Sequence, residues 1–208
     1  MEKESNIEKV SGNLFTSLAA TAVSVAATAN PLVGFLPLLA ATPAAIRHKK
    51  RVDATLEEIS ETLQHHDSLL RELSDSQYQF MAELVNVVLR TVDQKKLDYL
   101  KIAITKGAQA IAMTSEEATQ LSRLLRDITA DEAQFLVNHI DKKTVFIDFD
   151  KNIKKYEMCV RRGSEEHKLF MGLCTLGLAA FSQKHFEVDA YHFVDIAHDL
   201  VRLITTPP

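Results

Sequence analysis

Hydrophobic and polar positions divide the chain into an uncharged opening and a long amphipathic body. From Val10 to Ile46 there is no charged side chain, and a strongly basic run at 47–51 follows directly. After that run, apolar residues recur at the three- and four-residue spacing that is typical of amphipathic helices. The pattern predicts a mainly α protein. Its residues 1–46 are expected to form an apolar helical hairpin or a kinked span, either membrane-associated or buried.

The uncharged segment has two halves on either side of Asn30-Pro31, a pair that favours a turn or kink. The halves 14–29 and 32–46 contain 16 and 15 residues. A helix needs about 20 apolar residues to cross a bilayer, so each half alone is short. Small residues recur every four positions in the first half, a spacing that lets helices pack closely in membranes. The residues expected to pack or insert are Thr16, Ala20, Ser24, Thr28, Leu32, Phe35, Leu36, Leu38 and Leu39.

Two other interpretations of this segment stay open. Leu14 to Ala26 resembles the apolar core of a secretory signal peptide, with a small-residue cleavage pattern at 27–29, although the leader before it is long and acidic. Alternatively, residues 10–46 form the buried core of a soluble fold or a partner-binding hairpin, because core helices share this composition.

Proline and charge mark the end of the uncharged segment. Pro31, Pro37 and Pro43 recur every six residues, which argues against one uninterrupted helix. The basic flank that follows fits the positive-inside rule and places everything after it in the cytoplasm. We therefore expect inner-membrane association with a cytoplasmic body, or a cytoplasmic protein if the apolar segment is buried. The basic flank consists of Arg47, Lys49, Lys50 and Arg51.

Residues 47–75 are expected to form the basic flank and a coiled-coil-like connector helix. Apolar positions here alternate at spacings of four and three for about three heptads, which is the pattern of a coiled-coil seam. A histidine in the seam either sets the register of an oligomer or marks where the helix packs on its own domain. The predicted oligomerisation seam consists of Val52, Leu56, Ile59, Leu63, His66, Leu70 and Leu73.

Residues 76–128 are expected to form a helical body. A helix start is predicted at Ser74-Asp75-Ser76, and capping boxes are predicted at Thr114-Glu117 and Thr129-Glu132, because each has a hydroxyl followed three residues later by glutamate. Apolar residues at helical spacing follow these starts. They include Phe80, Leu84, Val87, Val88 and Val92, and then Leu97, Leu100 and Ile104.

Residues 129–208 mix helices and strands in the order of a winged helix-turn-helix module. Strand-like composition at 145–149 and 156–160 precedes a helix that starts at Ser164. A hairpin over 178–193 and a final amphipathic helix complete the module. We expect a winged-helix-like α+β unit at the end of the chain.

The charges of this module favour protein contacts over nucleic acid. Its expected recognition helix begins with Glu165 and Glu166, where contacts to bases and phosphates would be needed. Arg161 and Arg162 are the only basic pair beside that helix. A winged-helix DNA-binding regulator is therefore the weaker alternative.

Composition and motifs narrow the function further. The chain has 208 residues, a net charge of −4 and 25% charged residues, which is ordinary for a globular protein. The two cysteines, Cys159 and Cys174, are expected to be reduced and packed. Asp148-Phe-Asp150 is interpreted as a solvated turn rather than a metal site. The sequence carries no phosphate-binding loop, nucleophile elbow or C-x-x-C pair, so we expect a non-enzymatic protein without cofactor or metal.

The layout resembles uncharacterised bacterial helical proteins, some of them linked to phage-defence or toxin-like systems. The uncharged run 10–46, the connector 47–75 and the ending LCTLGLAAF at 173–181 carry this resemblance. It implies a cytoplasmic domain that senses or assembles and an N-terminus that acts on membrane lipid as an anchor or permeabilising effector. Self-association and a protein partner are the expected interactions, and a soluble adaptor or regulator is the alternative function.

Overall fold

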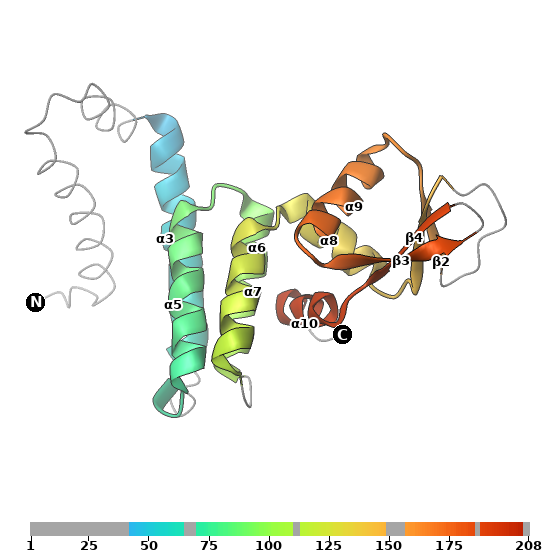
Figure 1. Cartoon of the computed structure of the whole chain (residues 1–208). Coiled ribbons are helices and arrows are strands. Elements are labelled where there is room, and N and C mark those ends of the chain that lie inside the picture. The colour runs from blue at the N-terminus through green and yellow to red at the C-terminus, as the bar shows by residue number, and fades with distance from the viewer. Residues whose placement is uncertain (1–41, 65–69, 110–112, 149–156, 186–187, 206–208) are drawn as a thin grey trace, which may run out of the picture. The chain divides into compact units, whose positions relative to one another are not determined.

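A computed structural model describes residues 42–64, 70–109, 113–148, 157–185 and 188–205. The chain divides into two compact units, Met1–Glu58 and Ile59–Pro208. The described residues are mainly helical, and a small sheet lies near the C-terminus (Figure 1). The expected mainly α architecture is therefore confirmed. Residues 1–41 of the predicted apolar hairpin or kinked span lie outside the described residues.

The elements carry the labels of Figure 1. The described helices are α3 (Pro43–Gln64), α5 (Asp75–Arg90), α6 (Gln94–Gln109), α7 (Ser115–Asp127), α8 (Ala130–His139), α9 (Glu165–Thr175) and α10 (Asp195–Ile204). The described strands are β1 (Thr144–Ile147), β2 (Glu157–Val160), β3 (Ala179–His185) and β4 (Val188–Phe193). Each helix and strand that we predicted after position 75 has a counterpart close to its expected position.

Helix α3 begins inside the segment that we had assigned to the apolar opening. The Thr42 hydroxyl accepts a hydrogen bond of 3.2 Å from the Ala45 backbone N–H, and Pro43 is the first helical residue. Proline is favoured there because its missing N–H would have no partner within the helix. The connector was expected to start at 47. It starts four residues earlier because Pro43 begins a helix rather than interrupting one.

Reciprocal side-chain caps begin the next helices. Ser74 and Gln77 form a capping box at α5, and the predicted boxes at α7 and α8 are both present. One assignment was wrong at the other end of α5, because the helix stops at Arg90 and Val92 is 62% exposed. Thr91 ends α5 by taking an extended conformation, so Val92 does not continue the apolar face.

Helix α5 packs against both α6 and α7. Its core residues Phe80, Leu84 and Val88 are fully buried. Phe80 lies so close to α6 that a Cβ atom added at Gly107 would be 2.7 Å from its Cε1 atom. The buried Gln77 amide also donates a 3.2 Å hydrogen bond to the Gly107 carbonyl. Glycine at this position therefore lets the two helices approach closely.

Helix α6 also holds the ends of two other helices through its lysines. The Lys96 ammonium donates to the Arg126 and Ile128 carbonyls at the end of α7, at 2.7 and 2.6 Å. The Lys106 ammonium donates to the Arg202 and Thr205 carbonyls at the end of α10. A cation stabilises the C-terminal end of a helix, where carbonyls lack partners within the helix. These bonds tie α7 and α10 to α6.

The sheet has four strands in the order β2-β1-β4-β3. Strand β1 pairs in parallel with β2 and antiparallel with β4, and β3 and β4 form an antiparallel hairpin. Between β1 and β3 the chain contributes one described helix, α9, together with strand β2. This mixed sheet supplies the strands that we expected near the end of the chain. Strand β2 directly precedes α9 among the described elements, at the place where a helix-turn-helix would have its first helix.

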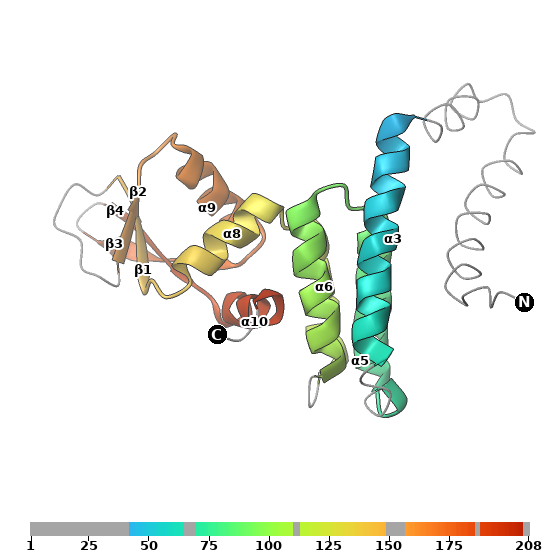
Figure 2. The same cartoon turned by 180° about the vertical axis from the view of Figure 1, so that it is seen from behind.

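Helices α8 and α9 lie beside the sheet (Figure 2). Aromatic rings connect these helices to the sheet. Phe170 of α9 meets Tyr191 of β4 edge to face at a centroid distance of 5.3 Å and lies 6.5 Å from Phe135 of α8. Helices α8 and α9 also approach closely, because a Cβ atom added at Gly172 would lie 1.9 Å from a Glu132 carboxylate oxygen. The aromatic contacts and this small residue fix α9 between α8 and the sheet.

Candidate functional site

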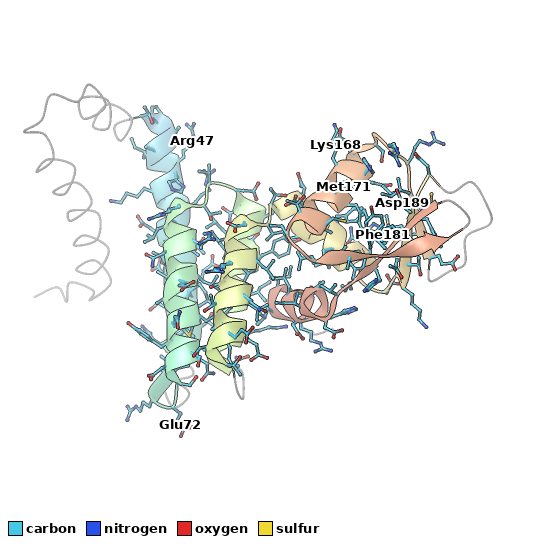
Figure 3. The ribbon with its side chains drawn as sticks, in the orientation of Figure 1. Arg47, Glu72, Lys168, Met171, Phe181 and Asp189 are labelled. Atoms are coloured by element: carbon cyan, nitrogen blue, oxygen red, sulfur yellow. The ribbon has the colours of Figure 1, made fainter. Side chains whose placement is uncertain are left out.

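The basic flank lies on the first turns of α3. Arg47, Lys49 and Lys50 are exposed and Arg51 is half-buried, with Arg47 near the start of the helix (Figure 3). Ile46, the last residue of the uncharged run, is 62% exposed beside them. The first turn of α3 has no acidic residue, although acidic side chains are the ones that a helix N-terminus favours. The helix therefore presents a positive, partly apolar start.

The predicted oligomerisation seam is partly covered within a single chain. Val52 and Ile59 are buried. The remaining described seam residues are half-buried, namely Leu56, Leu63, Leu70 and Leu73. His66 lies outside the described residues, as do the predicted membrane and packing positions Thr16, Ala20, Ser24, Thr28, Leu32, Phe35, Leu36, Leu38 and Leu39.

A polar groove in the unit Ile59–Pro208 was not anticipated from the sequence. It runs along the C-terminal halves of α5 and α7 and has a cavity volume of about 830 Å³. Six charged side chains line it, namely Glu83, Arg90, Asp93, Lys96, Arg123 and Arg126. Four of these side chains are cationic and two are anionic, so the groove is positive although the net charge of the whole chain is −4.

Hydrogen bonds occupy most of the groove's charged groups. Glu83 accepts a 2.5 Å bond from the Ser122 hydroxyl, and Asp93 accepts a 2.9 Å bond from the Lys96 backbone N–H. Arg126 forms two bonds with the Asp127 carboxylate, at 2.9 and 3.2 Å. Most of the charged side chains that line the groove are therefore held by hydrogen bonds to other residues of the fold.

Lys96 combines structural and electrostatic roles at this groove. Its ammonium bonds the carbonyls at the end of α7. Burial lowers the pKa of Lys96, and the carboxylates of Asp127, Glu132 and Asp93 oppose that shift. Lys96 is therefore a half-buried cation of the groove lining whose hydrogen bonds are made within the fold.

In the C-terminal module, Asp148 lies directly after β1 and binds Arg162. Asp148 has a φ of 57° and accepts bonds from the Arg162 backbone N–H at 2.7 Å and from its Nε atom at 3.1 Å. These bonds hold the pKa of Asp148 below its usual range. A second carboxylate, Asp189, lies 3.9 Å from the Arg162 guanidinium. Arg162 is therefore already paired within the fold.

Two apolar side chains are exposed on the same module. Met171 lies on α9 and Phe181 on β3 (Figure 3). Phe181 is 50% exposed and meets Tyr191 at a centroid distance of 5.5 Å. Lys168 on α9 pairs with Glu165 at 2.6 Å, so the acidic start of α9 is partly neutralised.

Metal ligands and thiols are the remaining chemical groups of the described part of the chain. Within residues 42–64, 70–109, 113–148, 157–185 and 188–205, no group of three His, Cys, Asp or Glu side chains is placed to hold a metal ion. Cys159 and Cys174 are both half-buried. Burial raises the pKa of Cys174 to about 11. A thiol with so high a pKa forms little thiolate and is a poor nucleophile.

The chain was compared with known proteins. No family model, curated protein or solved structure matches it. Among the helices that the structure describes, none has the length and apolarity needed to cross a membrane.

Proposed function

We propose that the protein is a non-enzymatic, membrane-associated helical protein. Residues 10–46 would enter or lie on the lipid, and the start of α3 would lie among the phospholipid head groups. The observation that supports this is the exposed basic start of α3, directly after an uncharged run that ends in the exposed Ile46. Arg47 and Lys50 have no ion-pair partner within the part of the chain that the structure describes.

The charges of this flank set the size of the expected effect. A Lys or Arg near an anionic membrane surface contributes about 1 kcal/mol. Three exposed cations would therefore contribute about 3 kcal/mol, which corresponds to about 100-fold in affinity. Inside the fold Arg47 and Lys50 bring no comparable gain, because neither has an ion-pair partner among the described residues and helix N-termini favour anions.

Vesicle flotation of the full-length chain tests this proposal. The triple variant Arg47→Gln/Lys49→Gln/Lys50→Gln should need about 100-fold more lipid for half-binding to vesicles of phosphatidylcholine and phosphatidylglycerol. It should differ little from the parent on pure phosphatidylcholine. The charge-matched control Lys95→Gln/Lys143→Gln/Arg161→Gln removes three exposed cations elsewhere. Equal losses in the two triple variants would refute a specific role of α3.

Carbonate extraction tests the part played by the uncharged segment. If residues 10–46 insert, the full-length chain stays with membranes in carbonate and is released by detergent. A full-length chain that is soluble and monodisperse without detergent would refute insertion and support the alternative, a soluble adaptor or regulator whose residues 10–46 are buried or bind a partner.

Assembly is the second part of the proposal. Self-association through the seam Val52–Leu73 would bring several apolar segments together, as an anchor or a permeabilising effector. The half-buried Leu56, Leu63 and Leu70 leave apolar surface that a second copy would cover. Sedimentation of Leu56→Ser/Leu63→Ser against the parent chain tests this. An unchanged oligomeric state with intact helicity would refute it.

We infer that the C-terminal module is a variant of the winged-helix unit that contacts protein, with strand β2 in the place of the first helix of a helix-turn-helix. The support is a β3–β4 hairpin that follows α9, with β4 paired to β1. Arg162 is held by Asp148 and Asp189, which reduces its attraction for phosphate. Retention on duplex DNA that falls with salt and is lost on Arg161→Ala/Arg162→Ala would instead favour the DNA-binding alternative.

A further inference from the structure

We infer that the groove between α5 and α7 binds an acidic segment of a partner protein, and that Arg90 and Arg123 contact its carboxylates. The inference does not depend on membrane association. It rests on which charges of the groove already have partners within the fold and which do not.

Four of the six charged side chains that line the groove are occupied. Glu83 bonds Ser122, Asp93 bonds the N-terminal end of α6, Lys96 bonds two carbonyls, and Arg126 bonds Asp127. Arg90 and Arg123 differ from these four. Both are exposed, and neither has a hydrogen-bond or ion-pair partner among the described residues.

Arg90 and Arg123 come from different walls of the same groove. Arg90 is the last residue of α5 and Arg123 lies in the second half of α7. A guanidinium presents a planar fork of donors that matches a carboxylate and binds it through two parallel bonds. Two such forks around one cavity suit a ligand with two carboxylates.

The dimensions of the groove fit a short stretch of extended peptide. On α5 its lining reaches from Glu83 to Arg90, a separation of seven positions. At 1.5 Å per helical residue this corresponds to about 10 Å. An extended chain advances about 3.3 Å per residue, so about three residues of a ligand lie along it.

The carboxylates of the groove favour a peptide over a nucleic acid. Glu83 and Asp93 would repel a continuous phosphate backbone. A peptide carries N–H groups as well as carboxylates. The second Glu83 carboxylate oxygen accepts only a long bond of 3.4 Å from the Gln79 side chain, and its other lone pair can accept such a donor. Asn86 adds a side-chain amide to the same wall. An acidic peptide is therefore complementary to both signs of charge.

Fluorescence anisotropy with a labelled probe tests the inference. The probe is a peptide of alternating glutamate and serine, titrated with the full-length chain in a mild non-ionic detergent. Arg90→Gln/Arg123→Gln should weaken binding at least tenfold. The control Lys95→Gln/Arg161→Gln removes two exposed cations elsewhere and should change it less than twofold.

A conservative pair separates recognition from the stability of α5. Arg90 lies in the last turn of α5, where any cation stabilises the helix. Arg90→Lys/Arg123→Lys keeps both charges and removes the planar forks. We expect it to melt at the temperature of the parent chain and still to bind the probe several-fold more weakly.

Three results would overturn the inference. The first is an equal loss of binding in the groove variant and its control. The second is equal binding of a probe with glutamine in place of glutamate. The third is displacement of the probe by single-stranded oligothymidylate or inorganic phosphate at concentrations below those of the unlabelled peptide, which would assign the groove to phosphate.

Discussion

The contact between Gly107 and Phe80 allows a prediction whose sign depends on competing magnitudes. Replacing a glycine by alanine inside an exposed helix usually stabilises it by about 1 kcal/mol. At Gly107 the new Cβ would lie 2.7 and 2.8 Å from two ring carbons of Phe80. Carbon atoms in favourable contact are about 3.5–4.0 Å apart, so the ring or the helix must move by about 1 Å.

Burial makes that movement costly. Phe80 is fully buried in the α5 core and has no solvent-exposed space to enter. Overpacking of a core costs about 1–3 kcal/mol. A shift of α6 would in addition strain the hydrogen bond from Gln77 to the Gly107 carbonyl, and a hydrogen bond of this kind contributes about 1 kcal/mol. We expect Gly107→Ala to lower the free energy of unfolding by about 2 kcal/mol, or the melting temperature by about 4–8 °C.

A double-mutant cycle with Phe80→Leu provides the assay. Urea denaturation and thermal melting, followed by circular dichroism, are measured for the parent, both single variants and the double variant. Leucine removes the ring atoms that would clash, so Gly107→Ala should be neutral or stabilising in that background. The coupling energy should be about 2 kcal/mol, within the range for residues in contact.

Two outcomes would refute this reasoning. A higher melting temperature for Gly107→Ala in the parent background would mean that helix propensity outweighs the clash. The same loss in the Phe80→Leu background would mean that the ring is not what the new methyl group meets.

Three further predictions follow from close contacts and shifted pKa values. Gly172→Ala should displace the Glu132 carboxylate from its capping box at the start of α8 and lower the free energy of unfolding in urea by about 1 kcal/mol. In the double variant Gly172→Ala/Glu132→Ala, the free energy of unfolding should be the same as in Glu132→Ala alone. In a Cys159→Ser background, Cys174 should react with iodoacetamide at pH 8 about two orders of magnitude more slowly than a free cysteine, since its pKa is raised to about 11, and urea should abolish the difference. Burial against Phe135 lowers the pKa of His139, with Lys142 acting in the same direction and Glu166 and Asp141 opposing it. Below about pH 6.5 the unfolded chain then binds one proton more than the folded chain, so the free energy of unfolding should fall as the pH drops through that value. A denaturation series from pH 7.5 to 5 should show a smaller fall for His139→Gln than for the parent chain. An equal fall in both chains would contradict this.

Local signals in the sequence predicted most of the elements. Capping boxes at Thr114 and Thr129 act within four residues, so the sequence alone located the starts of α7 and α8. Ser74-Gln77 has the same form and also begins a helix. The start of α3 was missed for a reason that local chemistry explains. Thr42-Pro43 is a hydroxyl cap followed by proline at the first helical position, and that signal was available.

Of the candidate functional sites, the basic start of α3 could be predicted from the sequence and the groove between α5 and α7 could not. The basic start of α3 is contiguous in sequence, so its position and exposure could be expected from the run at 47–51. The groove could not, because Arg90 and Arg123 lie 33 positions apart and meet only when α5 packs against α7. The charge at Glu83 likewise has its role set by Ser122, which lies 39 positions further along the chain.

The sequence by itself therefore determined the helical character of the body, the starts of its helices and the separation of an uncharged opening from a basic flank. These properties follow from interactions between residues a few positions apart. Only the tertiary structure decided the strand order β2-β1-β4-β3, the close approach of Gly107 to Phe80 and the placement of Arg90 and Arg123 around one groove. Each of these depends on contacts between distant segments, whose pairing is set by the packing of the whole core rather than by local pattern.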